Sequence, residues 1–197
     1  RSSDLAAALR FAQQLVERRG GVSAAEVIQA GKLGYPRTNL FMPGPVGGPC
    51  LEKDPHIFAE GLRELGIEPE ITLAARRVNE RQPAEISAHI ARIASAMPHF
   101  AKKPVITLMG LAFKGQPATD DLRGTMARPI FDHMRQSFPN AVFQGFDAVV
   151  AEKDIRAFGL SPVSSLEKAF DKASLVLIMN NHSVFSGMPI ENLAASM

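Results

Sequence analysis

The only cysteine in the chain, Cys50, lies among residues whose types and spacing could support nucleophilic catalysis. It ends the run Gly44-Pro45-Val46-Gly47-Gly48-Pro49-Cys50, and Lys53 and Asp54 follow shortly after it. The thiolate form of cysteine is the nucleophile, and a nearby lysine or the N-terminal end of the following helix favours that form. The glycines allow backbone amides to approach a ligand, and a carboxylate can activate water. We therefore predict a reactive thiol at Cys50, assisted by Lys53 and Asp54.

Two other roles for Cys50 can be weighed from the sequence. A lone cysteine is often a small buried apolar residue, and this structural interpretation stays open at this point. A metal site is disfavoured, because no second cysteine and no suitably spaced pair of histidines accompanies Cys50. We therefore expect no bound metal.

A second segment combines glycine with charged residues after an apolar run. The run Gly110-Leu111-Ala112-Phe113-Lys114 follows a predicted strand at 105–109, and Asp121 and Arg123 lie downstream. A strand, a glycine-containing loop and a helix commonly bind phosphate in this order, although the spacing matches neither a dinucleotide fingerprint nor a Walker loop. Lys114 could contact a phosphate as a point charge and Arg123 could bind one bidentately. The alternative is a solvated lysine and an ion pair of Arg123 with Asp121 or Asp120.

Three further polar residues are candidates of lower specificity. Arg37 lies in a loop, where an exposed arginine is the commoner case. Asp147 and His182 follow the second and third predicted strands, where each could bind a ligand or cap the next turn, and for His182 the cap is favoured. Because the carboxyl ends of parallel strands meet at one edge of a sheet, we expect Lys114, Asp147 and His182 on one rim.

The elements that must position these residues fall into two regions. Residues 1–101 are predicted to be all-helical, with helices at 4–19, 23–30, about 54–66 and 69–97, and with Cys50 at the end of an ordered loop. Pro83 is predicted to kink or break the last of these helices. Residues 102–197 alternate strands at 105–109, 141–146 and 174–179 with helices near 126–137, 149–158 and 165–172. This alternation predicts a Rossmann-like α/β domain with a parallel sheet.

Composition narrows the class of protein. The chain has 197 residues, of which 46% are hydrophobic, so it can bury a substantial core. A net charge of +2 and the lack of tryptophan argue against nucleic acid as a partner. A single cysteine fits a reducing compartment such as the cytoplasm, and no apolar run is long enough to predict a membrane span. Since the chain begins at Arg1, we expect it to be a fragment of a longer protein.

Three blocks of the sequence resemble the UDP-glucose/GDP-mannose dehydrogenase family, and within it the branch that oxidises UDP-N-acetylhexosamines. Residues 36–55 are similar to the catalytic-cysteine segment of the family. Residues 110–123 resemble the start of its nucleotide-binding C-terminal domain, and residues 175–185 resemble a later strand and turn of that domain. The dipeptide Val78-Asn79 fits the central region of the family.

The resemblance implies an NAD-dependent oxidation of the C6 alcohol of a UDP-sugar to the carboxylate, a step in polysaccharide biosynthesis. Cys50 would hold the intermediate aldehyde as a thiohemiacetal and then as a thioester, and Asp54 would help to activate the hydrolytic water. Arg37 would reach the sugar nucleotide bound by a neighbouring subunit, and Lys114 would contact the diphosphate. The complete set of residues expected to bind substrate is Arg37, Gly47, Gly48, Phe113, Lys114 and Arg123.

The sequence also departs from the family pattern. No GxGxxG fingerprint follows a predicted strand, so the NAD-binding domain of the family is not recognised here and the chain alone is expected to be inactive. Pro49 replaces the more usual histidine or serine, and the glycine loop is shorter than the usual pattern. An alternative is therefore a non-catalytic module that binds a UDP-sugar and dimerises. In both cases the helical region is expected to mediate a homodimer or a higher homo-oligomer, with no membrane or nucleic-acid partner.

Overall fold

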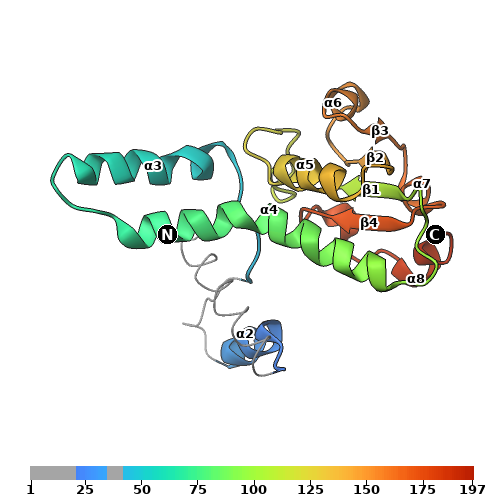
Figure 1. Ribbon diagram of the computed structural model, residues 1–197, viewed down its shortest axis with the longest axis horizontal. Helices are drawn as coiled ribbons and strands as arrows, with labels where there is room; N and C mark the ends of the chain where they lie inside the picture. Colours follow the sequence, from blue (N-terminus) through green and yellow to red (C-terminus); the bar gives the residue numbers. More distant parts are fainter. Residues whose placement is uncertain (1–20, 35–41) are drawn as a thin grey trace. The chain divides into compact units, whose positions relative to one another are not determined.

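The computed structural model describes residues 21–34 and 42–197, which form two packed units (Figure 1). The first unit contains the residues up to Val46 together with Cys50–Gln82. The second contains Gly47–Pro49 and Pro83–Met197. The domain boundary expected at residues 101 and 102 stays a prediction.

The first unit is helical, as predicted. Helix α2, Ala24–Lys32, begins after Ser23, whose hydroxyl oxygen accepts a hydrogen bond from the Glu26 amide at 3.4 Å. This bond caps the helix predicted at 23–30, because it gives one of the first amides of the helix an acceptor. The helix predicted at 4–19 lies outside the described residues.

Helix α3, Pro49–Arg63, begins about five residues earlier than the sequence predicted. The sequence placed the helix start at Asp54 or Pro55, and a proline inside a helix leaves the carbonyl four residues earlier without its donor. That carbonyl belongs to Leu51, and it accepts a hydrogen bond at 3.1 Å from the guanidinium of Arg76 instead. Pro49 is well suited to the first helical position, where no amide hydrogen is needed.

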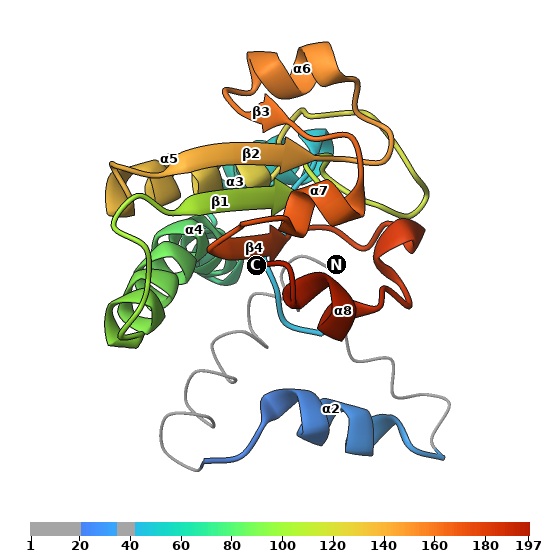
Figure 2. The same cartoon turned by 90° about the vertical axis from the view of Figure 1, so that its right-hand side faces the viewer.

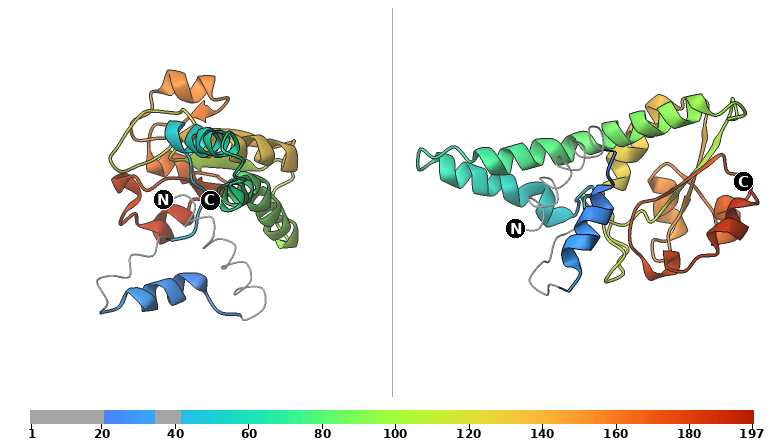
Figure 3. Two further views of the ribbon diagram at one scale, coloured as in Figure 1. Left: turned by 90° about the vertical axis from the view of Figure 1, so that its left-hand side faces the viewer. Right: turned by 90° about the horizontal axis from the view of Figure 1, so that it is seen from below.

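Helix α4, Glu70–Ala96, has the length expected from the sequence. It continues through Pro83, so the predicted break is wrong. Its first part, up to Gln82, runs beside α3 in the first unit (Figures 1 and 3), where Ala59 of α3 is almost fully buried.

The second unit contains the predicted parallel sheet. Its strands are β1 Val105–Met109, β2 Val142–Phe146, β3 Ser161–Pro162 and β4 Leu175–Ile178, and their order in the sheet is β3-β2-β1-β4. Strand β3 was not predicted, because two residues carry no periodic pattern. The order places β2 and β4 on either side of β1, so the loops after these three strands emerge at one edge.

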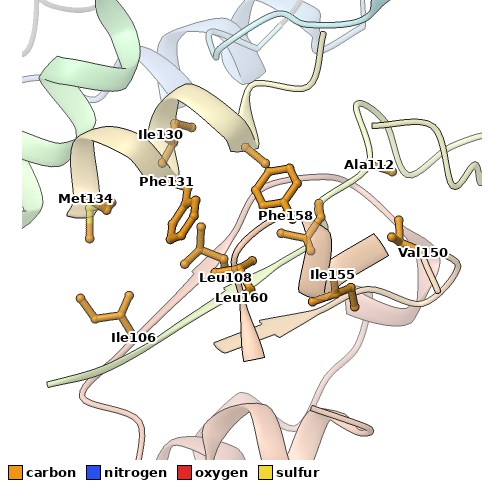
Figure 4. Packing of buried hydrophobic residues seen from close by; sticks show 12 residues of the cluster. Ile106, Leu108, Ala112, Ile130, Phe131, Met134, Val150, Ile155, Phe158 and Leu160 are labelled. Atoms are coloured by element: carbon orange, nitrogen blue, oxygen red, sulfur yellow. The ribbon is translucent and has the colours of Figure 1, made fainter. Parts of the chain in front are cut away.

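Helices cover both faces of this sheet (Figure 2), which confirms the α/β fold class. They are α5 Ala127–Ser137, α6 Glu152–Ala157, α7 Leu166–Phe170, the 3₁₀ turn η1 Ser183–Phe185 and α8 Ile190–Ala194. On one face Ile106 and Leu108 of β1 pack with Phe131 and Met134 of α5 (Figure 4). On the other face Met109 packs with α7 and α8 residues. Alternate residues of β1 therefore supply the two cores.

Candidate functional site

Cys50 is the second residue of α3 and is exposed. The prediction that Cys50 would end an ordered loop is therefore wrong, because the helix already begins at Pro49 and Cys50 lies in its first turn. The buried-thiol interpretation is also wrong, since the side chain is open to solvent. A cysteine in the first turn of a helix faces backbone amides that lack intrahelical partners, which is a favourable environment for negative charge.

Lys53 and Asp54 form an ion pair in the next turn of α3. The Lys53 ammonium donates to Asp54 Oδ1 at 2.6 Å, and both side chains are more than half exposed. The hydrogen bond to Asp54, followed by the charge of that carboxylate, raises the pKa of Lys53, with a smaller contribution from Cys50. The structure thus brings Lys53 within electrostatic reach of Cys50, but its strongest partner is Asp54.

The main chain that leads to Cys50 is held by a side chain of α4. Asn79 Oδ1 accepts a hydrogen bond from the Val46 amide at 2.9 Å, and Asn79 Nδ2 donates to the Val46 carbonyl at 2.8 Å. Sequence analysis noted Asn79 only as part of a family match and gave it no role. The signal that could have identified it is an amide side chain on a long helix at a position where the core pattern requires burial.

The glycines before Cys50 pack against the second unit's own loops. Gly48 has a φ of +113°, and its amide donates to the Gly124 carbonyl at 2.7 Å. A Cβ atom on Gly48 would lie 2.8 Å from the ring of Phe113, and one on Gly47 would lie 2.6 Å from the Gly124 oxygen. Glycine is therefore needed at both positions for packing within the chain, in addition to the ligand approach expected from the sequence.

At the edge of the sheet, Asp147 organises the loop that follows β1. Its Oδ2 accepts from the amides of Leu111 and Ala112 at 2.7 and 3.2 Å. Its Oδ1 accepts from the amides of Val149 and Val150 at 2.9 and 3.1 Å. Because both carboxylate oxygens are engaged by backbone donors, Asp147 serves to shape this rim.

The loop after β4 contacts the same rim through its polar residues. His182 Nδ1 accepts from the Val184 amide at 3.1 Å and caps η1, which confirms the capping role favoured by the sequence. Asn181 Oδ1 accepts from the Gly115 amide at 3.1 Å, and Asn180 donates to the Ala112 carbonyl at 3.3 Å. The two asparagines fix the β1 loop and were not singled out from the sequence.

The cations of the β1 loop have different surroundings. Lys114 Nζ lies 5.2 Å from the centre of the Phe113 ring. Arg123 forms a two-point ion pair with Asp121, with contacts of 3.0 and 2.8 Å, yet its side chain remains 78% exposed. Hydrogen bonds from the Arg123 side chain and then its amide lower the pKa of Asp121 to about 2. The ion pair that the sequence left open is therefore present.

Some expected features fall outside what the structure describes. Arg37 lies outside the described residues. Within residues 21–34 and 42–197, no group of three or more histidine, cysteine, aspartate or glutamate side chains is arranged to hold a metal ion. None of the helices in the described part of the chain combines the length and apolar character needed to cross a membrane.

Comparison with known families gives two adjacent matches. Residues 8–81 match the central-domain model of the UDP-glucose/GDP-mannose dehydrogenase family. Residues 107–197 match the UDP-binding-domain model of the same family.

Curated relatives resemble the chain along nearly all of its length. A UDP-N-acetyl-D-mannosamine dehydrogenase of Pyrococcus horikoshii is 28% identical over 100% of this chain and 43% of the relative. A UDP-N-acetyl-D-glucosamine 6-dehydrogenase of Pseudomonas aeruginosa is 29% identical over 96% of this chain and 44% of the relative. The chain thus spans less than half the length of these relatives.

Solved structures agree with this similarity. A UDP-D-ManNAc dehydrogenase from Pyrococcus horikoshii superimposes with a TM-score of 0.78 at 27% identity, covering 99% of this chain and 43% of that one. A UDP-glucose dehydrogenase from Pyrobaculum islandicum gives a TM-score of 0.73 at 25% identity, covering 94% of this chain and 43% of that one.

Proposed function

Because the chain belongs to the UDP-glucose/GDP-mannose dehydrogenase family, we propose that it is the part of a UDP-sugar 6-dehydrogenase that supplies the nucleophile and the nucleotide-binding loop. The observation that carries the proposal is the exposed Cys50 in the first turn of α3, followed by the Lys53–Asp54 ion pair. The names of the relatives favour UDP-N-acetylmannosamine, UDP-N-acetylglucosamine or UDP-glucose as the substrate. A cytoplasmic location is part of the same proposal.

The proposed chemistry at Cys50 concerns the C6 aldehyde of the sugar. The sulfur adds to the aldehyde carbon, and the carbonyl oxygen takes up a proton, giving a thiohemiacetal. Loss of a hydride from that carbon, with release of the hydroxyl proton to solvent, leaves a thioester. Water then adds to the thioester, the carbon–sulfur bond breaks, and the products are the sugar carboxylate and the restored thiol. Retaining the carbon on sulfur prevents release of the aldehyde between the two oxidations.

Asp54 and Lys53 are proposed to act in the hydrolytic step. Asp54 accepts a proton from the attacking water, as its match to the family suggests. The 2.6 Å contact with Lys53 holds this carboxylate in one position on α3. Lys53 also places a positive charge one helical turn after Cys50 in α3.

The hydride acceptor is proposed to be NAD, which would accept one hydride in each oxidation. The described residues do not fit a dinucleotide fingerprint, because the glycines after β1, Gly110 and Gly115, lack the G-x-G-x-x-G spacing. No residue of this chain is therefore assigned to NAD, and the steps proposed for the chain are those at sulfur and at the nucleotide.

The β1 loop is proposed to bind the nucleotide diphosphate. Lys114 and Arg123 would contact the phosphates, and the ring of Phe113 supports Lys114 through the cation–π contact. Gly47 and Gly48 shape the neighbouring main chain. Arg37 is proposed to reach a nucleotide bound by a neighbouring subunit.

Calorimetric titration of the chain with UDP, GDP and NAD tests the nucleotide half of the proposal. We expect UDP to bind and NAD not to bind. The variant Lys114→Ala should weaken UDP binding by about ten- to a hundredfold, since a hydrogen bond to a charged group contributes about 1.5–3 kcal/mol and each 1.4 kcal/mol is tenfold in Kd. Lys172→Ala, at an exposed lysine elsewhere in the second unit, is the matched control. Equal UDP affinity in wild type and Lys114→Ala would refute the role of Lys114.

The nucleophile is tested with a UDP-sugar that carries a ¹³C-labelled C6 aldehyde. A thiohemiacetal carbon signal should appear in the NMR spectrum with the wild-type chain and be absent with Cys50→Ser. If wild type also lacks the signal while UDP binds, the observations favour the second candidate function, a non-catalytic module that binds a UDP-sugar.

Assembly into a homodimer or higher homo-oligomer is also part of the proposal. The first unit exposes large apolar side chains on α3, on the turn that follows it and in the first turn of α4, which are Ile57, Phe58, Leu65, Ile67 and Ile71. Clustered exposed apolar residues favour protein–protein contact. Sedimentation equilibrium should detect an oligomer, and a monomer at high concentration would refute this part.

A further inference from the structure

We infer that Asn79, supported by Gln82 and Arg76, is a positioning residue for Cys50. These three side chains of α4, which we name the α4 clasp, bind the main chain on both sides of the cysteine, at Gly44, Val46 and Leu51. The inference rests on the proposed function in one respect, namely that Cys50 is the nucleophile.

Asn79 makes the central contact of the clasp. Its carboxamide accepts from the Val46 amide at 2.9 Å and donates to the Val46 carbonyl at 2.8 Å. Two antiparallel hydrogen bonds to one residue fix both the distance and the rotation of that peptide segment. Val46 lies four residues before Cys50, so little chain remains between the fixed point and the sulfur.

Gln82 lies one helical turn after Asn79 and extends the contact. Its Nε2 is within 3.4 Å of the Gly44 carbonyl and 3.3 Å of Asn79 Oδ1. The Val46 amide and Gln82 Nε2 both donate to the same end of the Asn79 carboxamide. That end must be the carbonyl oxygen, because the amide nitrogen cannot accept a hydrogen bond. Gln82 therefore supports the orientation that the two Val46 contacts already give to the Asn79 carboxamide.

Arg76 lies one turn before Asn79 and binds beyond the cysteine. Its guanidinium donates to the Leu51 carbonyl at 3.1 Å and to Glu80 at 3.0 Å. Pro55 leaves this carbonyl without its usual helical donor, so Arg76 replaces the missing bond in the turn that contains Cys50. The two anchor points, Val46 and Leu51, therefore bracket the cysteine.

The burial of the clasp suggests a role beyond packing. Asn79 and Gln82 are 5% and 1% exposed. The Oε1 atom of Gln82 and the Nε atom of Arg76 are buried without a hydrogen-bond partner among the described residues. Unpaired buried polar atoms destabilise a fold, and an apolar residue would avoid that cost. Retaining polar groups here is expected where a loop must be held in one arrangement.

The experiment compares wild type, Asn79→Ala and the isosteric Asn79→Asp, with Arg77→Ala on the exposed side of α4 as the control. Two quantities are measured on the chain without substrate. They are the hydrogen-exchange rate of the amides at 44–51 and the rate of alkylation of Cys50 by iodoacetamide at neutral pH. Because the chain has one cysteine, the alkylation rate reports on Cys50 alone.

We expect Asn79→Ala to raise the exchange rate of the Val46 amide about tenfold, because its acceptor is lost. Cys50 alkylation should fall about two- to fivefold, since only the thiolate reacts and a frayed first turn favours it less. Asn79→Asp keeps the acceptor for the Val46 amide but sets a buried carboxylate oxygen against the Val46 carbonyl, so it should also raise the exchange rate at 44–51, and Arg77→Ala should match wild type.

Either of two results would overturn the inference. Unchanged exchange in a folded Asn79→Ala or Asn79→Asp chain would show that the clasp does not hold the loop. Raised exchange with unchanged alkylation would show that it holds the loop without positioning Cys50. A failure of the proposed function is seen separately, in the labelled-aldehyde experiment, because neither readout here involves substrate.

Discussion

Substitution of Gly48 by alanine should measure how much the second unit depends on close packing at this glycine. Gly48 has a φ of +113°, a conformation that side chains with a Cβ rarely adopt. The added Cβ would also lie 2.8 Å from the Phe113 ring, well inside ordinary van der Waals contact. The strained backbone costs about 1–2 kcal/mol and the overpacking about 1–3 kcal/mol. We therefore expect Gly48→Ala to lower the free energy of unfolding by about 2–5 kcal/mol.

The assay is urea denaturation followed by far-ultraviolet circular dichroism, since the chain has no tryptophan to report by fluorescence. Gly44→Ala is the matched control, because a Cβ at Gly44 meets no atom within 4 Å. A Phe113→Leu background separates the two causes, because it removes the ring but leaves the backbone strain. In the Phe113→Leu background, Gly48→Ala should lower the free energy of unfolding by only about 1–2 kcal/mol. The reasoning is refuted if Gly48→Ala and Gly44→Ala unfold at the same urea concentration.

Three further predictions concern the second unit. Thr125→Val should lower the free energy of unfolding, measured by thermal denaturation, by about 1–3 kcal/mol, because the buried hydroxyl donates to the Leu111 carbonyl at 2.7 Å. Thr125→Ser should retain that bond and serves as the control. Asp121 has a pKa lowered to about 2, so its ion pair stabilises the fold fully above the unfolded pKa of about 4, and this contribution is lost as the pH falls towards 2. In Asp121→Asn, the free energy of unfolding measured against pH should lack that loss. Leu108→Ala should lower the free energy of unfolding in urea by about 2–5 kcal/mol, because Leu108 is fully buried in the core. Val142→Ala, at a half-exposed position, should lower it far less.

The strands of the second unit could be predicted closely because their apolar runs are short and continuous. Residues 105–109 were predicted as a strand, and β1 has the same limits. Strand β3 has two residues, one of them Pro162, and it is defined by its pairing with β2. Pairing of this kind depends on a partner distant in sequence, so a local pattern cannot indicate it.

The start of α3 illustrates a second limit of the sequence. Pro55 is ordinarily a sign that a helix begins nearby, but here the helix already exists and Arg76 satisfies the carbonyl that Pro55 leaves open. The compensation comes from another helix, 25 residues away in sequence. For the same reason the sequence could identify Asn79 as a family residue but could not predict its role, since its contacts to Val46 exist only after folding.

Pro83 has a consequence for the spectroscopy of α4. A proline has no amide hydrogen, so the carbonyl of Asn79, four residues earlier, has no helical donor although the helix continues on both sides. Carbonyl groups that accept weaker hydrogen bonds vibrate at higher frequency. A ¹³C label at the Asn79 carbonyl should therefore give an amide I band shifted above that of a label elsewhere in α4, and its position would report the hydrogen bonding of the main chain at the residue that holds the cysteine loop.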